Sequence, residues 1–206
     1  LVYISQPTEY GTLYSLQELE ELSAVCRERD LKLFVDGARL AYALASPAND
    51  VTLADLARLT DVFYIGGTKC GSLFGEAVVI PERGSIRQFV TQMKQHGALL
   101  AKGRLLGVQF EALFEDGLYL TIGEPAVKAT ARIREALKRA GYVVTMDSPT
   151  NLTFVALDQA GHERLSDKVR YSIWETLPDG RYLARIGTSW ATPEEDVVAF
   201  EQALAR

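Results

Sequence analysis

The sequence has few of the residues and runs that mark several large protein classes. Its 206 residues include two cysteines and two histidines, too few for a cysteine metal quartet or a disulfide scaffold. Its apolar runs, such as residues 62–65 and 77–80, are short and far below the ~20 residues that span a bilayer. The sequence therefore predicts a soluble protein with no metal site and no membrane partner. Two free thiols favour a reducing, cytoplasmic compartment.

Positive charge is not in excess either. The chain has 22 Lys and Arg against 27 Asp and Glu, a net charge of −5 at pH 7. Because a nucleic-acid surface needs a positive field to neutralise phosphates, we expect no nucleic-acid partner. The 48% of hydrophobic residues are enough for a sizeable core, which excludes intrinsic disorder. Residue 1 is Leu and residues 1–4 are already strand-like, so we expect the chain to start within a domain.

Strand and helix patterns alternate through the first half of the chain. Capping boxes, in which a Ser or Thr is followed three residues later by an acidic residue, open two helices at Ser15 and Thr52. In chain order we expect a strand at 1–4, a helix at 16–29, a strand at 31–35, a helix at 53–59, strands at 62–65 and 77–80, and helical segments between 86 and 114. Such alternation is typical of βαβ units and a mainly parallel sheet, whose ligands bind beyond the carboxyl ends of the strands.

The composition shifts after Asp116-Gly117 towards a smaller α+β pattern. Here we expect a helix at 125–140, strands at 142–146 and 152–157, a helix at 165–177, a strand at 182–187 and a last helix opening at 192–195. The predicted organisation is a large domain over residues 1–116 and a small C-terminal domain over residues 117–206.

Two charged residues stand at the ends of predicted strands, each next to a chain reversal. Asp36 follows the strand at 31–35 and Lys69 follows the strand at 62–65. A carboxylate in an apolar setting needs a cation or hydrogen-bond donors to stay ionised, and a lysine in such a place is suited to attack a carbonyl. The pair therefore suggests Schiff-base chemistry. Each residue alone leaves a plainer interpretation open, since Asp-Gly is an ordinary turn and Gly-rich lysine loops are commonly solvated.

The glycines around Lys69 do not form a nucleotide site. A P-loop has Gly, Lys and then Ser or Thr, whereas this chain has Thr68-Lys69-Cys70. No Gly-x-Gly-x-x-Gly opens a helix in the first βα unit, so the dinucleotide fingerprint is missing as well. A nucleotide-binding function is not supported.

Four segments carry a resemblance to a known family. They are residues 34–40, 64–71, 148–152 and 184–192, which occur in order over nearly the whole chain. In this pattern Asp-Gly-Ala-Arg is followed by a lysine 33 positions after the aspartate. The chain resembles the threonine aldolase and β-eliminating lyase family of pyridoxal-phosphate enzymes. The resemblance implies the α/β aspartate-aminotransferase-like fold (fold type I), with part of the large, mainly parallel-sheet domain followed by a small α+β C-terminal domain.

The resemblance also implies roles for cofactor-binding residues. Lys69 corresponds to the lysine that forms the internal aldimine with pyridoxal 5′-phosphate, and Asp36 to the aspartate that keeps the ring nitrogen protonated. Arg39 corresponds to an arginine that lies against the cofactor, and the Thr68 hydroxyl is placed to donate to its phosphate. A surface arginine at a helix start and a simple turn threonine remain the alternatives for Arg39 and Thr68.

Substrate contacts follow from the same resemblance. Arg185 corresponds to the arginine that binds the carboxylate of the amino-acid substrate, a task that suits a planar guanidinium. Thr8 stands in Pro7-Thr8-Glu9, where many aldolases have an Asn-Thr-His-like element, and would serve the cofactor or the substrate hydroxyl. That departure leaves the substrate range open. Lys102 and Arg104 lie where the family places subunit and phosphate contacts, although a solvated helix face explains them equally well.

The implied activity is cleavage of a β-hydroxy-α-amino acid, threonine or allo-threonine, into glycine and an aldehyde through an external aldimine. Another β-eliminating lyase or an aminotransferase on the same fold is the first alternative, and a cofactor-free α/β binding domain is the second. The resemblance implies a homodimer or homotetramer. It also places the cofactor-stacking histidine and the phosphate cup upstream of residue 1, so we expect this chain to be the carboxyl-terminal portion of a longer enzyme.

Overall fold

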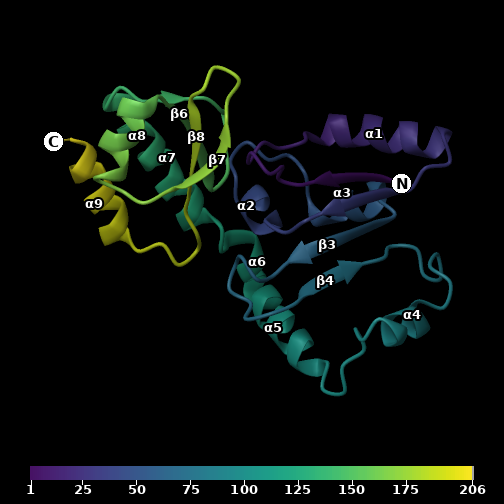
Figure 1. Ribbon diagram of the computed structural model, residues 1–206. Helices are drawn as coiled ribbons and strands as arrows, with labels where there is room; N and C mark the ends of the chain where they lie inside the picture. Colours follow the sequence, from purple (N-terminus) through teal and green to yellow (C-terminus); the bar gives the residue numbers. More distant parts are fainter. Residues whose placement is uncertain (206) are drawn as a thin grey trace. The chain divides into compact units, whose positions relative to one another are not determined.

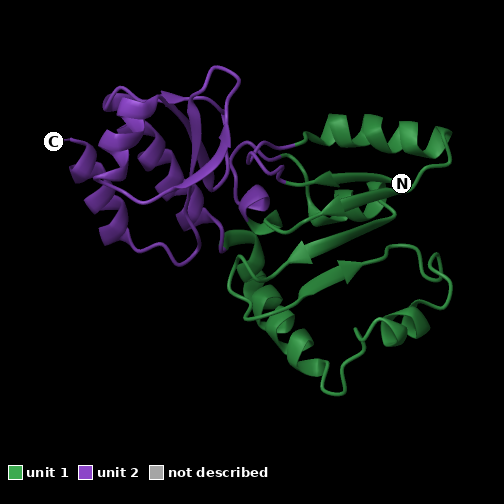
Figure 2. Ribbon diagram, in the orientation of Figure 1, with its two compact units in different colours: residues 1–6, 14–41, 50–121 green, residues 7–13, 42–49, 122–206 purple. Residues whose placement is uncertain are grey.

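The computed structural model describes residues 1–205 and contains two four-stranded sheets (Figure 1). The chain divides into two compact units (Figure 2). The first unit comprises residues 1–6, 14–41 and 50–121, and the second comprises 7–13, 42–49 and the residues from 122 onward. The predicted domain division at residues 116 and 117 stays a prediction. Within residues 1–205, no helix combines the length and the apolar character that a membrane crossing requires.

The sheet of the first unit has the strand order β1-β2-β3-β4. Its strands are β1 (Val2–Ser5), β2 (Leu33–Asp36), β3 (Val62–Gly66) and β4 (Glu76–Val79). The first three run parallel, which confirms the mainly parallel sheet, and β4 runs antiparallel to β3. The connection from β3 to β4 explains the reversal, because residues 67–75 are too few for a parallel crossover, which takes about a dozen residues or more.

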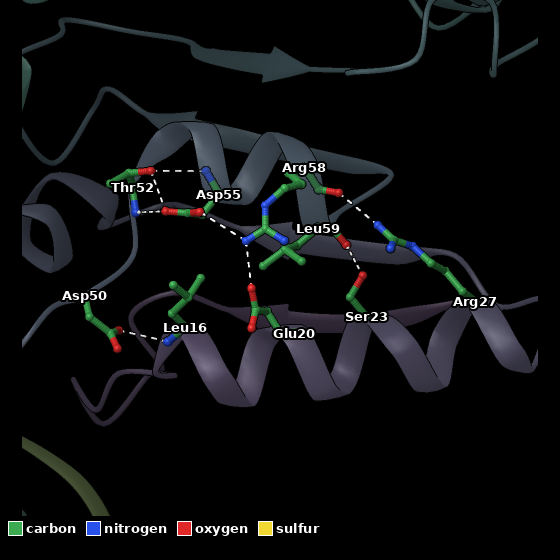
Figure 3. Close-up of polar contacts among 9 residues, drawn as sticks. All are labelled: Leu16, Glu20, Ser23, Arg27, Asp50, Thr52, Asp55, Arg58 and Leu59. Carbon is green, nitrogen blue, oxygen red and sulfur yellow. Dashed lines mark hydrogen bonds and ion pairs between the residues drawn. The ribbon is translucent and has the colours of Figure 1, made fainter.

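Two capped helices, α1 (Leu16–Glu28) and α3 (Leu53–Leu59), form where the sequence predicts them. Both begin with a complete capping box. Polar contacts join the two helices (Figure 3). The Ser23 hydroxyl donates to the Leu59 carbonyl at 2.6 Å and the Arg27 guanidinium to the Arg58 carbonyl at 2.9 Å. These contacts fix the second half of α1 against the end of α3.

One face of this sheet is packed. Because side chains alternate along a strand, Leu33 and Val35 of β2 share a face with Phe63 and Ile65 of β3, and all four are at most 7% exposed. The helices contribute the buried apolar residues Leu19, Cys26, Leu56 and Leu59. A cleft of about 590 Å³ is lined jointly by residues of α1, β2 and α3, so the two helices and the strand lie next to one another there.

The remainder of the first unit is helical. It contains α4 (Phe89–Gln95), α5 (Arg104–Phe114), the 3₁₀ turn η1 (Glu115–Gly117) and α6 (Leu118–Thr121). The predicted interruption near residue 96 is confirmed, since α4 and α5 are separate helices. A short helix, α2 (Leu40–Leu44), follows the turn after β2 and was not predicted; its first two residues belong to the first unit and residues 42–44 to the second.

The second unit is an antiparallel sheet with helices, which confirms the expected α+β pattern. Its strand order is β5-β6-β8-β7, with β5 (Val143–Val144), β6 (Leu152–Leu157), β7 (Ser172–Thr176) and β8 (Tyr182–Gly187). The helices are α7 (Glu124–Arg139), α8 (Gln159–Ser166) and α9 (Glu194–Leu204). Buried residues of these helices form one core with Val155, Leu157 and Ala184 of the central strands.

The predicted helix at 165–177 is wrong. Helix α8 ends at Ser166, and residues 172–176 form β7, which pairs with β8. The error has a physical origin, because Leu165, Val169, Ile173 and Leu177 recur every four residues and imitate a helical stripe. The helix begins at Gln159, after the N-cap residue Asp158, whose side chain accepts a hydrogen bond from the Gly161 amide at 2.6 Å.

Candidate active site

Asp36 ends β2, and its carboxylate lies between side chains from both neighbouring strands. The hydroxyl of Tyr3, on β1, donates to Oδ2, and the hydroxyl of Tyr64, on β3, donates to Oδ1. The backbone amide of Ala38 also donates to Oδ1, at 2.9 Å. The Asp36 carboxylate is thus held by three hydrogen-bond donors: two tyrosine hydroxyls from the neighbouring strands and one backbone amide from the turn that follows.

These donors decide the charge of Asp36. Partial burial raises the pKa of its carboxyl, but the hydrogen bonds from Tyr3, Tyr64 and the Ala38 amide, with the positive charge of Lys69, outweigh burial and lower that pKa below its usual value. Burial and the neighbouring Asp36 raise the pKa of the Tyr64 hydroxyl, so Tyr64 remains a protonated donor. The arrangement favours an ionised Asp36 that can pair with a cationic group.

Two glycines allow the turns after β2 and β3 to touch. A Cβ on Gly37 would lie 1.9 Å from the Tyr64 carbonyl oxygen, and one on Gly66 would lie 2.5 Å from the carbonyl oxygens of Gly37 and Ala38. The Gly66 amide donates to the Gly37 carbonyl at 2.9 Å. A larger residue at either position would force the two turns apart. The contact brings the loop of Lys69 to within electrostatic reach of Asp36.

Glu76 holds the loop that carries Lys69. Its carboxylate accepts hydrogen bonds from the Gly67 amide at 2.6 Å and from the Thr68 hydroxyl at 3.0 Å. Just before the loop, the Gly66 carbonyl accepts a hydrogen bond from the hydroxyl of the fully buried Tyr119 at 2.8 Å. Thr68 and Lys69 are exposed on this anchored loop. The amide and hydroxyl donors of the loop are therefore engaged by Glu76, next to the lysine.

The predicted cofactor residues all belong to the first unit. Asp36 and Lys69 lie at the carboxyl ends of β2 and β3, Thr68 precedes the lysine, and Arg39 lies partly buried in the turn before α2. Among residues 1–205, no three His, Cys, Asp or Glu side chains gather as a metal site would require. The roles assigned to these residues stay predictions.

Arg185, the predicted carboxylate clamp, lies in the second unit on β8. Its guanidinium carbon is 4.4 Å from the centre of the Trp174 ring, a cation–π contact. Trp174 in turn packs edge-on against Tyr10 and Phe154, with ring centres 6.1 and 6.2 Å away. The aromatic cluster supports the flat side of the guanidinium and leaves its N–H edge for hydrogen bonding. Nearby Arg181 pairs instead with Asp179 in its own turn, at 2.7 Å.

Thr8, the other predicted substrate contact, lies in a tight turn of the second unit. Its hydroxyl lies 2.6 Å from the Thr12 hydroxyl and accepts from the Thr12 amide at 3.2 Å. The turn is tied down at Gly11, whose carbonyl accepts from the hydroxyls of Ser148 and Thr150 at 3.1 and 3.0 Å. The structure thus gives Thr8 a local role in the turn, and its predicted substrate contact stays a prediction.

Three residues of the site were missed from the sequence: Tyr3, Tyr64 and Glu76. Tyr64 stands five positions before Lys69 in a strand where its aromatic ring looks like ordinary packing. Glu76 opens β4 as the strand partner of Gly66. Tyr3 and Tyr64 could be found only through the pairing register of the strands.

Comparison with known proteins agrees with this geometry. The family model of the β-eliminating lyases matches residues 1–160. The chain is 39% identical to the low specificity L-threonine aldolase of Pseudomonas sp. (strain NCIMB 10558) over 96% of its own length and 56% of that protein. It is similar to the structure of Leishmania major threonine aldolase, with a TM-score of 0.93 and 46% identity over 100% of this chain and 60% of that one.

A more distant structure shows how widely the fold is shared. A Thermus thermophilus aspartate aminotransferase variant has a TM-score of 0.69 at 17% identity, covering 99% of this chain and 56% of that one. The aspartate-aminotransferase-like fold is thereby confirmed. The chain spans about half the length of the curated relatives that it matches. On the family model, the sequence identity and the structural match together, the chain belongs to the β-eliminating lyase family.

Proposed function

We propose that the protein is a pyridoxal-phosphate-dependent lyase that cleaves a β-hydroxy-α-amino acid, threonine or allo-threonine, into glycine and an aldehyde. The observation that carries the proposal is the glycine-permitted contact between the turns after β2 and β3, which puts the charge of Lys69 within reach of the Asp36 carboxylate. The threonine aldolases among the relatives support the choice of reaction.

The residues of the first unit fit the proposed cofactor. Pyridoxal phosphate has an aldehyde, a basic ring nitrogen and a phosphate, which call for an amine, an anion and hydrogen-bond donors. Lys69 offers the amine and Asp36 the ionised carboxylate. The Gly67 amide and the Thr68 hydroxyl donate to the Glu76 carboxylate in the structure and would have to leave it to donate to the phosphate. Arg39, in the turn after Asp36, would lie against the cofactor.

When bound, the cofactor supplies a sink for the electron pair released at Cα of the substrate. Asp36 would hold a proton on the ring nitrogen by its negative charge, which deepens that sink. Lys69 would hold the cofactor covalently until an amino-acid substrate takes its place. In the reaction the Cα–Cβ bond breaks, the β-hydroxyl loses its proton as the aldehyde forms, and Cα gains a proton to give glycine.

Residues of the second unit would orient the substrate. The two N–H groups on the open edge of Arg185 match the two oxygens of an amino-acid carboxylate, and Trp174 restricts the guanidinium to one plane. Thr8 would donate to the cofactor or to the substrate hydroxyl. Both assignments rest on the family and on the placement of these side chains within the second unit.

Cofactor attachment is the first experiment. We expect the intact protein to develop a visible absorbance band with pyridoxal phosphate, and borohydride reduction to fix the cofactor on Lys69 as seen by mass spectrometry. Lys69→Ala should lose the band while remaining folded by circular dichroism. Lys128→Ala, which removes an exposed lysine paired with Glu124, should keep it. A band that survives in Lys69→Ala would overturn the role of Lys69, and wild-type protein with no band would favour a cofactor-free binding domain.

Product analysis separates the lyase reactions. Threonine or allo-threonine should give glycine and acetaldehyde in equal amounts. Formation of pyruvate and ammonia from serine, or of a new amino acid from an added 2-oxo acid, would instead identify a β-eliminating lyase or an aminotransferase on the same fold. Arg185→Lys keeps the charge but loses the planar fork, so it should raise KM more than it lowers kcat.

We also propose a homo-oligomer, a dimer or a tetramer. Around the start of α5 the first unit exposes apolar side chains, with Leu99, Leu100, Leu105 and Val108 each at least 50% exposed. A second copy of the chain would remove these side chains from water. Light scattering should give a multiple of the monomer mass for the wild type and a smaller mass for Leu105→Glu. A monomeric wild-type protein would contradict this assembly.

We also propose that the protein is cytoplasmic. Its cysteines, Cys26 and Cys70, are buried free thiols, which agree with a reducing compartment.

A further inference from the structure

The carboxylate of Asp36 is hydrogen-bonded from both sides by phenol hydroxyls. Tyr3 donates to Oδ2, while Tyr64 and the Ala38 amide both donate to Oδ1. An ionised carboxylate accepts at roughly four lone-pair positions. The three donors fill both positions on Oδ1 and one on Oδ2. One acceptor position on Oδ2 therefore remains for a further donor.

The strand register builds this arrangement. Tyr3 is the strand partner of Phe34, and Phe34 is the partner of Val62. Asp36 lies two residues after Phe34 on β2, and Tyr64 lies two residues after Val62 on β3. Both therefore point to the same face of the sheet as Phe34. The Tyr3 and Phe34 rings stack with centres 5.4 Å apart, and the Phe34 and Tyr64 centres are 6.2 Å apart. Phe34 thus separates two tyrosine rings whose hydroxyls converge on one carboxylate.

We propose that Tyr3 and Tyr64 are positioning residues for the proposed reaction, whose two hydroxyls clamp the Asp36 carboxylate in one orientation and leave one acceptor position on Oδ2 for the protonated ring nitrogen of pyridoxal phosphate. This inference rests on the proposed function. The physical reason is pre-organisation. The terminal torsion of an aspartate is broad, so an unclamped carboxylate would lose rotational freedom when it pairs with the cofactor.

The clamp has a second consequence for the charge of Asp36. Hydrogen bonds to an ionised carboxylate favour the ionised form. Removing a phenol hydroxyl should therefore raise the pKa of Asp36 towards its ordinary value. The change is measurable in the protein without cofactor, which separates the clamp from the rest of the catalytic machinery.

Phenylalanine substitutions test the clamp because they remove only the hydroxyls and keep the stacked rings. The variants are Tyr3→Phe, Tyr64→Phe and the double variant in the intact protein. Tyr182→Phe is the matched control, since its hydroxyl donates to Gln159 in the second unit. An NMR titration of the Asp36 carboxyl carbon without cofactor should show a higher pKa in each single variant, the highest in the double variant, and no change in the control.

The loaded protein supplies the second readout. We expect the double variant to bind pyridoxal phosphate about tenfold more weakly, because its unclamped Asp36 carboxylate loses rotational freedom when it pairs with the cofactor. Its kcat should fall while KM for the amino acid stays within about twofold, because a binding loss would raise KM instead. The control should match the wild type in both measurements.

Two results would overturn the clamp. One is a double variant whose Asp36 titration and cofactor affinity equal those of the wild type. The other is a double variant that is merely less stable to urea, with the Asp36 titration unmoved, since that is a packing role. Failure of the proposed function gives a different result. If the wild-type protein takes up no pyridoxal phosphate, the proposed enzyme activity is contradicted. If the wild type binds pyridoxal phosphate and the double variant binds it equally well with an unchanged Asp36 titration, only the clamp is contradicted.

Discussion

The two faces of the first unit's sheet use alternate residues of the same strands for different purposes. On β2, Leu33 and Val35 point to the face covered by α1 and α3 and are 1% and 0% exposed. Phe34 and Asp36 point to the other face, beside Tyr3, which is 57% exposed. We call these the helix face and the tyrosine face. One strand thus supplies both core packing and the candidate catalytic carboxylate.

The difference shows how a buried strand can end in a charge. The helix face removes large apolar side chains from water and is held by the polar contacts between α1 and α3 (Figure 3). The tyrosine face is partly open and satisfies Asp36 with phenol and amide donors. Stability and chemistry are therefore separable by the face of the sheet on which a residue lies, which mutations can test.

The largest expected effect is on the helix face. Phe63→Ala should lower the free energy of unfolding by about 3–5 kcal/mol, because it removes a ring that is 2% exposed and leaves a cavity. Phe34→Ala, on the tyrosine face of the neighbouring strand, should cost less because its ring is only partly buried. Urea unfolding of both variants measures the difference. Equal losses would mean that the two faces contribute equally to stability.

The contact between the turns comes next. Gly37→Ala should destabilise the protein by roughly 1–3 kcal/mol, as overpacking does, since its Cβ would clash with the Tyr64 carbonyl. It should also weaken cofactor uptake by moving Lys69 away from Asp36. Gly107→Ala is the control: this site in α5 has nothing within 4 Å of the new Cβ, so the variant should gain about 0.5–1 kcal/mol. A neutral Gly37→Ala would show that the turns have room to separate.

A single hydrogen bond of the helix face has a smaller expected effect. Ser23→Ala removes the donor to the Leu59 carbonyl in a buried setting, and should cost about 1–2 kcal/mol. Ser166→Ala removes a comparable bond to the Glu163 carbonyl on an exposed helix and should cost less. Thermal or urea unfolding gives both values. Cofactor affinity should stay unchanged in Ser23→Ala, because the helix face does not reach the site.

The smallest expected effect is a pH dependence from the tyrosine face. Burial alone would raise the pKa of Asp36, but its hydrogen bonds from Tyr3, Tyr64 and Ala38 and the charge of Lys69 lower it in the folded state. The unfolded chain then binds the proton more tightly than the folded protein does. Asp36 therefore stabilises the fold above its unfolded pKa of about 3.9. This stabilisation disappears as the pH falls through the lower pKa that Asp36 has in the folded state. Asp36→Asn should show a weaker loss of stability between pH 5 and pH 3 in cofactor-free urea titrations. Identical pH profiles would contradict the lowered pKa.

Much of the fold was predictable because local signals and tertiary structure agree. The capping boxes at Ser15 and Thr52 start α1 and α3 where expected, and the strands predicted at 31–35 and 62–65 form the parallel strands β2 and β3. The exception is β7, where apolar residues four positions apart predicted a helix. Pairing of β7 with β8 overrode that local pattern, because backbone hydrogen bonds to a neighbouring strand do not appear in the spacing of one segment.

The candidate site divides in the same way. Asp36 and Lys69 were predictable, since charged residues at the ends of buried strands stand out against their apolar surroundings. Tyr3, Tyr64 and Glu76 were not, because a tyrosine in a strand and an acid at a strand start have many ordinary uses. Their contacts depend on the register between strands, which pairs Tyr3 with Phe34 and Gly66 with Glu76.

By itself, then, the sequence determined the alternation of strands and helices, the family pattern and the positions of the aspartate and the lysine, because each of these is set by residues near one another along the chain. Only the tertiary structure decided the glycine contact between the two turns and the tyrosines on either side of Asp36. Those features join residues about 30 positions apart, whose distances are set by strand pairing and close packing.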